Sequence, residues 1–281
     1  MKRKLLSVFL SLCMMLTLVP GALAAEPEPT PSEEGEITTQ AALKNALTAA
    51  GSANNAGDKV VTLNGDIVLD NTGVAANSAA ITVPEGVTLN GNGHTISVGK
   101  QWNGETKTHI LSVENTQAET TTTIKNLTIV GSADTKSGIH AYNCTGTVKL
   151  EDVTIQNCGN AAVQVNSSKV EATNLNTEGN VWGAINVDKG ASLDTSPSFT
   201  LNSGTLKEPT KIWTELANSS DNDDNSSKII SVPETWKEMK SDFDGKTYYA
   251  NADDVAIWVG ETAYATLQDA AKAEIGRASC R

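Results

Sequence analysis

The chain repeats a short strand-like pattern at nearly constant spacing. The central apolar residues of four such segments are separated by 26, 22 and 24 positions, and they are Leu127, Val153, Leu175 and Phe199. A period of 20 to 50 residues that is built from short strands is typical of a solenoid. The repeat therefore constrains the fold more than any other feature of the sequence.

A second series of apolar residues runs in step with the first. Ile139, Val163 and Ile185 are separated by 24 and 22 positions. Each segment alternates apolar residues with Thr, Asn or Lys, as expected of a strand with one buried face. The connections are too short for crossover helices, so strands of successive rungs should stack in parallel. We therefore predict an all-β fold, a parallel β-solenoid, over residues 37–206.

A helix is expected in front of the first strand. Thr38 or Thr39 can cap it, apolar residues recur at helical spacing between Ala42 and Ala50, and Gly51 can end it. The first rung of a solenoid would otherwise leave unpaired backbone groups at its open edge, which invites aggregation. We expect this short N-terminal helix to cap that edge.

Two segments near the start of the solenoid carry a resemblance to a known family. Val61–Ile67 and Ile81–Ile96, with the phrases Leu-Asn-Gly-Asp-Ile and Leu-Asn-Gly-Asn-Gly-His-Thr-Ile, resemble the opening of right-handed parallel β-helix domains of the pectate-lyase-like superfamily. The similarity is greatest to large secreted surface proteins of Gram-positive gut bacteria. The resemblance implies a right-handed parallel β-helix, but a fold alone implies no activity.

The N-terminal residues have the pattern of a secretory signal peptide. A basic start precedes an apolar run from Leu5 to Val19, and Ala22-Leu23-Ala24 is a suitable cleavage site, so we assign residues 1–24 to the signal. Residues 25–36 are rich in Pro and Glu and are predicted to be a disordered linker. We expect an extracellular or wall-associated protein with no membrane span after the signal is removed.

The C-terminal part divides into three predicted segments. Residues 207–254 form an acidic, irregular spacer, and residues 255–273 resemble the start of a second, truncated domain of the same kind. Residues 274–281 include Ile275–Arg281, which resembles the translation of a common sequencing adapter. We therefore expect this last segment not to belong to the natural protein.

The chain is acidic and almost lacks arginine. Removal of the signal peptide and of residues 274–281 changes the formal net charge from −12 to −16, and residues 25–273 contain no arginine. Nucleic acids and anionic membranes bind proteins through Lys and Arg, so neither is an expected partner. Without the bidentate arginine fork, anionic polysaccharides are also poor candidate ligands unless calcium bridges them.

Neither a disulfide nor a metal site is predicted. Cys144 follows one strand, whereas Cys158 precedes the equivalent strand of the next rung, which places them about 16 Å apart and beyond bridging distance. We expect two separate thiols. The acidic run Asp221–Asn225 has Ser226 and Val232 where a calcium-binding EF-hand loop needs Gly and Glu. No metal ligands and no cofactor are assigned.

No catalytic residue is assigned either. The resemblance implies lyases that use a basic residue, often arginine, or hydrolases that use aspartates on adjacent rungs with a histidine. Asp134, Asp152 and Asp188 fall on different rungs in unrelated local sequences, so no acid and base are expected to converge.

The three histidines are expected to have structural roles. His94 lies in a phrase that is a recurring structural turn of the family, so we interpret it as a turn residue or a residue at the core edge. His109 and His140 are each expected to stand alone, with the same interpretation.

Two tryptophans are the candidate ligand-binding residues. Trp102 and Trp182 each lie beside Asn and Gly in a predicted turn. An exposed aromatic face can stack on a sugar ring while nearby polar groups bind its hydroxyls. The competing interpretation is that each ring packs over the edge of a rung. If Trp182 binds sugar, its replacement by Ala should weaken binding.

Three functional hypotheses remain open on the sequence. The first is a non-catalytic secreted or cell-surface module that binds a glycan or a surface protein, as an adhesin does. The second is a carbohydrate-active enzyme, either a polysaccharide lyase or a glycoside hydrolase. The third is a structural stalk. The lack of arginine and of converging carboxylates favours the first and third.

Overall fold

The computed structural model describes most of the predicted solenoid and the region that follows it. The described residues are 36–113, 119–190, 196–215, 229–240, 246–255, 257–259, 262–264, 267–268 and 270–271. The predicted signal peptide, nearly all of the predicted linker, the acidic run at 221–225 and residues 274–281 lie outside this set.

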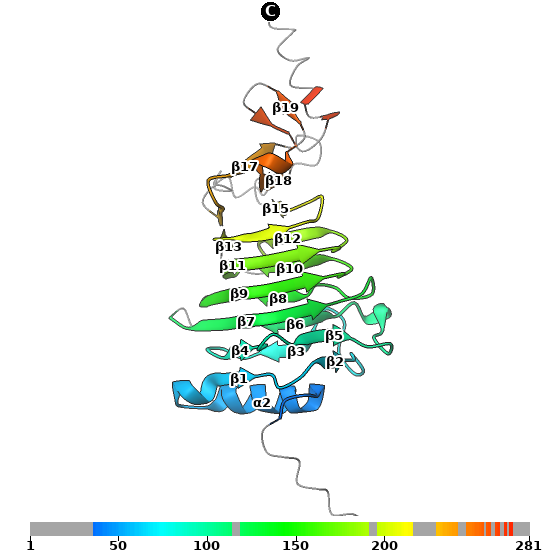
Figure 1. Cartoon of the computed structure of the whole chain (residues 1–281), viewed down its shortest axis with the longest axis vertical. Coiled ribbons are helices and arrows are strands. Elements are labelled where there is room, and N and C mark those ends of the chain that lie inside the picture. Colours follow the sequence, from blue (N-terminus) through cyan, green and yellow to red (C-terminus); the bar gives the residue numbers. More distant parts are fainter. Residues whose placement is uncertain are drawn as a thin grey trace, which may run out of the picture. The chain divides into compact units, whose positions relative to one another are not determined.

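Two sheets of stacked strands form the solenoid (Figure 1). Sheet A contains β1 (Val60–Thr62), β2 (Ile67–Leu69), β4 (Thr88–Asn90), β5 (Thr95–Val98), β7 (Thr121–Val130), β9 (Thr147–Gln156), β11 (Lys169–Glu178), β13 (Ser198–Leu201), β14 (Gly204–Leu206) and β16 (Ile230–Ser231). Sheet B contains β3 (Ala79–Val83), β6 (His109–Val113), β8 (Ile139–Tyr142), β10 (Ala161–Asn166), β12 (Gly183–Asp188), β15 (Ile212–Thr214), β17 (Trp236–Lys240) and β18 (Thr247–Asn251).

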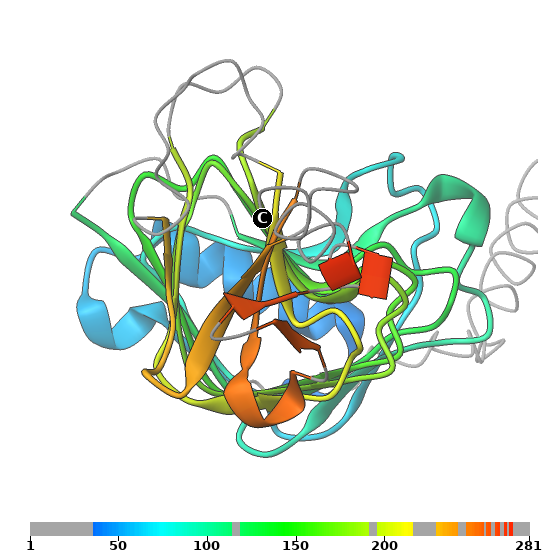
Figure 2. The same ribbon diagram turned by 90° about the horizontal axis from the view of Figure 1, so that it is seen from above.

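The chain passes from sheet A to sheet B and back once per rung, and the successive rungs superimpose when viewed along the stack (Figure 2). All pairings from β1 to β16 that build the two sheets are parallel; the antiparallel ones involve β18. The predicted all-β parallel β-helix is confirmed.

The strand registers match the sequence prediction for the first three residues of the first apolar series and for all three residues of the second. Leu127 pairs with Val153 and Val153 with Leu175 across sheet A. Ile139, Val163 and Ile185 are likewise in register across sheet B. All six point into one continuous core, where none has more than 2 % of its surface exposed. The hydrophobic effect of this burial favours the stacked arrangement.

The fourth member of the first series was assigned incorrectly. Phe199 pairs with Val170, whereas the residue opposite Leu175 is Gly204, 29 positions further on. Gly204 has φ +149°, and a Cβ there would collide with the backbone of Leu175. The apolar Phe199 fills the core at a different point along the strand, so spacing alone gave the wrong register.

The long strands of sheet A bend at residues in the left-handed region. Asn126, Asp152 and Asn174 have φ of 50°, 55° and 53° and lie one above another in β7, β9 and β11. Asn and Asp tolerate this conformation because their short polar side chains can hydrogen-bond locally. Asn174 Nδ2 donates to Asp152 Oδ1 at 2.7 Å, so the bends are also linked between rungs.

Helix α2 (Gln40–Ser52) is the predicted N-terminal helix. Thr39 caps it by accepting a hydrogen bond from the backbone N–H of Ala42 at 3.2 Å. Its face with Leu43, Leu47 and Ala50 is buried in the solenoid core beside β1 (Figure 1). No described helix is long and apolar enough to cross a membrane.

The solenoid pairing extends beyond the predicted boundary at 206. Strand β15 pairs in parallel with β12, and β16 pairs in parallel with β13. Strand β18 then adds to β15 in the antiparallel sense and pairs with β17. The segment predicted as an irregular spacer therefore contains strands, and the β17–β18 hairpin covers the free edge that β15 would expose.

Residues beyond 255 form a small separate pairing. Strands β19 (Trp258–Val259) and β20 (Thr262–Ala263) are antiparallel to each other. Thr266 and Asp269, whose spacing fits the capping box at the start of a helix, lie outside the described residues. A second domain that starts in this segment stays a prediction.

Substitutions at one of the stacked bends test its left-handed backbone conformation directly. We predict that Asn126→Val lowers the free energy of unfolding by about 1–2 kcal/mol, because a β-branched residue is strained at φ 50°. Asn126→Gly should cost less, since Gly adopts this conformation freely. Thr128→Val on the same strand is the control and should change stability little. Urea unfolding measures all three, and equal losses for Val and Gly would contradict the bend.

Candidate functional site

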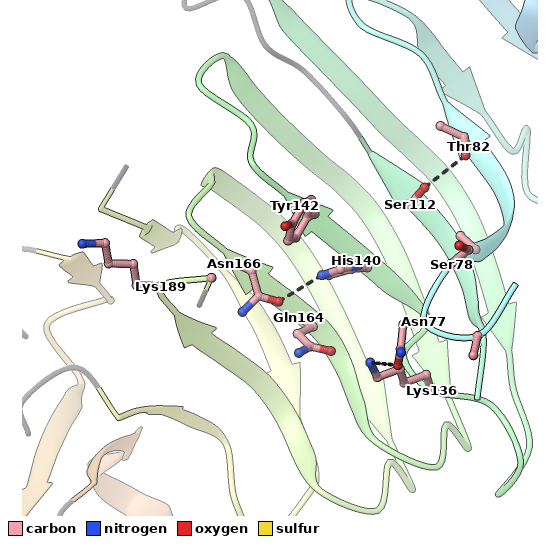
Figure 3. A pocket seen from close by; sticks show the side chains of 13 residues that line it. Asn77, Ser78, Thr82, Ser112, Lys136, His140, Tyr142, Gln164, Asn166 and Lys189 are labelled. Atoms are coloured by element: carbon pink, nitrogen blue, oxygen red, sulfur yellow. Dashed lines mark hydrogen bonds between the residues drawn. The ribbon is translucent and has the colours of Figure 1, made fainter. Parts of the chain in front are cut away.

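A polar cleft of about 660 Å³ lies on the outer face of sheet B (Figure 3). Its floor comes from four strands of that sheet, and its walls come from the turns before β3 and β8 and from the segment that follows β12. Its lining residues are Ala76, Asn77, Ser78, Ala79, Thr82, Ser112, Lys136, His140, Tyr142, Gln164, Asn166, Lys189 and Gly190.

The floor follows from strand alternation and parallel register. Ile139 and Ala141 of β8 point into the core, so His140 and Tyr142 point outward. Register then aligns outward positions of successive rungs in a row that consists of Thr82, Ser112, His140 and Gln164. Parallel stacking at about 4.8 Å thus converts residues from four distant segments into one polar strip.

Hydrogen bonds hold several of these side chains in place. Thr82 Oγ1 and Ser112 Oγ lie 3.2 Å apart, and His140 Nε2 lies 3.0 Å from Asn166 Oδ1, as Figure 3 shows. Ser137 Oγ donates to Gln164 Oε1 at 3.2 Å. The strip is therefore preorganised, which limits the side-chain entropy that a ligand would have to remove.

Tyr142 supplies an aromatic surface beside this strip. It is 41 % exposed, and its ring centroid lies 5.4 Å from that of His140 with a tilt of 49°. A partly exposed aromatic ring next to hydrogen-bonding groups suits the two sides of a sugar, one apolar and one hydroxylated.

One wall of the cleft carries an ammonium group. Lys136 lies in the turn before β8, and its Nζ donates to Asn77 Oδ1 at 2.8 Å (Figure 3). Asn77 stands in the turn before β3 and has φ 65°, in the left-handed region. Partial burial lowers the pKa of Lys136 from its usual value.

His109 and His140 form a stacked pair, contrary to the prediction that each stands alone. Their ring centroids are 4.1 Å apart and their planes differ by 18°. His109 is fully buried below the cleft floor, and both of its ring nitrogens have no hydrogen-bond partner in the described structure. No local sequence pattern marks this pair, because the two residues belong to different rungs.

Burial keeps both imidazoles neutral near pH 7. Desolvation is the main cause that lowers the pKa of His109 to about 2. Repulsion from Lys136 and from His140 in its protonated form acts in the same direction. Desolvation also lowers the pKa of His140 to about 4, with Lys136 acting in the same direction and the hydrogen bond to Asn166 opposing it. The lysine is therefore the charged group at this end of the cleft.

The far wall begins where β12 ends. Lys189 and Gly190 line it, and the Gly190 backbone N–H donates to Ser167 Oγ at 3.0 Å. The neighbouring Asp188 accepts hydrogen bonds from Asn186 Nδ2 and from the Glu215 backbone N–H, at 2.6 and 2.8 Å. Burial raises the pKa of Asp188. These contacts fix the carboxylate at the end of β12, outside the cleft lining.

The two tryptophans predicted as binding residues lie in different environments. Trp102 is only 7 % exposed and packs in the solenoid core, so the exposed face expected of it is absent. Trp182 is 54 % exposed beside the exposed Val181 in the turn before β12. It is not among the residues that line the cleft. Its role in binding stays a prediction.

The three aspartates considered for catalysis do not converge. Asp152 occupies a bend in sheet A, Asp188 ends β12 in sheet B, and Asp134 lies in the turn between β7 and β8. His94 lies in a turn with its Nδ1 3.5 Å from Asp66 Oδ1. The described residues include no group of three or more His, Cys, Asp or Glu side chains placed to hold a metal ion.

The two cysteines are buried thiols at different corners. Cys144 Sγ donates to the Val113 carbonyl oxygen at 3.0 Å. Burial is the main cause that raises the pKa of Cys158 to about 12, so this thiol stays protonated and unreactive at neutral pH.

Comparisons with known proteins identify no relative. No family model, no curated protein and no solved structure matches the chain. Function is therefore inferred from the fold and from the cleft.

The buried imidazole of His109 has a measurable consequence. We predict that His109→Phe raises the free energy of unfolding by about 1–2 kcal/mol at pH 7, because Phe preserves the stack and removes two unpaired polar atoms. The gain should grow as the pH falls below about 6.5, where the unfolded wild-type chain protonates His109 but the folded chain does not.

Urea unfolding of wild type and variant between pH 7 and pH 4 measures this difference, in which the shared carboxylates cancel. His94→Phe, at a partly exposed turn, is the control. A His109→Phe effect that did not change with pH would contradict the neutral buried state.

Proposed function

We propose that this chain is a non-catalytic, carbohydrate-binding module that holds its glycan in the cleft on sheet B. The observation that carries the proposal is the preorganised strip of hydroxyl, amide and imidazole groups beside the exposed ring of Tyr142. Such a surface can exchange hydrogen bonds with sugar hydroxyls along several rungs and stack on an apolar sugar face.

The setting we propose is that of a secreted or cell-surface protein with an adhesive role. The signal-peptide pattern at residues 1–24 and the resemblance of Ile81–Ile96 to pectate-lyase-like domains support this setting. The parallel β-helix agrees with the same superfamily. A surface protein as the partner, in place of a glycan, is the alternative that a polar cleft of this size favours less.

The lining of the cleft argues for binding over hydrolysis. A glycosidase generally uses two carboxyl groups about 5–9.5 Å apart, and none of the lining residues is Asp or Glu. One observation supports the lyase alternative, since the lowered pKa of Lys136 increases the fraction of its side chain in the neutral form that can accept a proton. A glycan that binds without forming unsaturated products would exclude that alternative.

A glycan array probed with the purified chain, with and without calcium, tests the proposal. For a glycan that binds, we predict that Tyr142→Ala weakens affinity by about 5- to 10-fold, the loss expected for one stacking contact. Trp182→Ala is the matched control, an exposed aromatic residue of a neighbouring rung that lies outside the cleft lining.

Calorimetric titration of both variants separates the two candidate surfaces. Loss of affinity in Trp182→Ala alone would move the binding site to the turn before β12, as the sequence suggested. Absence of binding to any glycan would instead favour a structural stalk.

A further inference from the structure

The ammonium group of Lys136 has an unusual environment. It is half-buried at one end of the cleft, and its hydrogen-bond acceptor is a neutral amide, Asn77 Oδ1 at 2.8 Å. Among the described residues it forms no ion pair, whereas five other pairs bring a Lys or His within 4.0 Å of a carboxylate. Partial burial of a cation without an anionic partner costs solvation free energy.

The charge of the cleft is opposite to that of the whole chain. The chain has a formal net charge of −12, yet the cleft lining contains Lys136 and Lys189 and no Asp or Glu. The nearby imidazoles of His109 and His140 are neutral at pH 7, so they add no positive charge to this end of the cleft. The lining of this cleft therefore differs in the sign of its charge from the chain as a whole.

We propose that the Lys136 end of the cleft is an anion subsite, which holds the carboxylate or sulfate group of an acidic glycan. This inference rests on the proposed function, because it names the chemical class of the ligand for the same cleft. Lys136 Nζ provides the charge, Asn77 Nδ2 is a neutral donor beside it, and the strip from His140 to Gln164 is left for hydroxyl groups.

The proposal revises the expectation that anionic glycans are poor ligands. That expectation used the net charge and the absence of arginine, which describe the whole chain. A bound group interacts most strongly with charges within a few ångströms, since more distant exposed charges are screened by salt over about 8–10 Å. The local lysine therefore outweighs the distributed acidic surface, although that surface should slow association.

The other groups around the subsite are consistent with this assignment. Tyr142 faces the histidine pair from β8, and Lys136 faces it from the preceding turn. Asn166 and Gln164 approach from β10 and Ser112 from β6, and all three are neutral. No lining residue would repel an oxyanion.

The decisive experiment compares acidic and neutral probes on the full chain. Trigalacturonate and its carboxyl-reduced counterpart test the carboxylate, and a sulfated galactose oligosaccharide and its desulfated counterpart test the sulfate. We expect an acidic probe to bind at least about 10-fold more tightly than its neutral counterpart, the usual gain from a charge-assisted hydrogen bond. Lys136→Gln should remove that preference, so that the acidic and neutral probes of each pair bind with equal affinity.

Lys149→Gln is the matched control, because Lys149 is a half-buried lysine on β9 of sheet A, away from the cleft. It should change affinity less than about 2-fold, so a larger loss would show that total charge is responsible. Equal affinity for the acidic and neutral probes would overturn the anion subsite while leaving the proposed function intact.

A second measurement distinguishes failure of the anion subsite from failure of the proposed glycan-binding function. Acetate and sulfate are titrated into the chain, and the ring proton resonances of His140 and Tyr142 are followed by NMR. Saturable shifts that disappear in Lys136→Gln would support the anion subsite even if no glycan bound, in which case only the proposed function would fail. No saturable shift with either anion, together with no preference for acidic glycans, would overturn the subsite.

Discussion

The in-register parallel pairing of each rung with the next is the constraint on which the structure depends. The backbone groups of one strand form hydrogen bonds with the strands above and below it. The sheets therefore have their unpaired strand edges at the two ends of the stack. Helix α2 closes one end, and the β17–β18 hairpin closes sheet B at the other. Because side chains alternate, the same register produces both the apolar core and the outer polar rows.

Register also explains how a polar cleft arises without any local motif. Ser112, His140 and Gln164 come from three rungs, and they form a common surface only because parallel stacking places them side by side. The stack brings Lys136 near two imidazoles that burial keeps neutral, so a single cation defines the electrostatics of that end. Chemistry in such a fold is distributed along the stack, one side chain per rung.

The sequence predicted the fold much better than the site. Inward residues such as Ile139 and Val163 recur at regular spacing, and core burial enforces that spacing. Outward residues have no such constraint, so the stacking of His109 on His140 left no periodic trace. The composition of a turn does not reveal which way the ring of Trp102 packs, so the sequence left its exposed and packed orientations open. The register of Phe199 was predicted incorrectly because an insertion shifts the last rung.

Hydrogen–deuterium exchange of the full chain, with and without a saturating glycan from the array, tests the central claim most directly. Ligand in the cleft should slow exchange in three segments that are distant in sequence and adjacent in the fold, namely 76–79, 136–142 and 164–166. Protection confined to the Trp182 turn or to sheet A, with these three segments unchanged at saturation, would contradict the account.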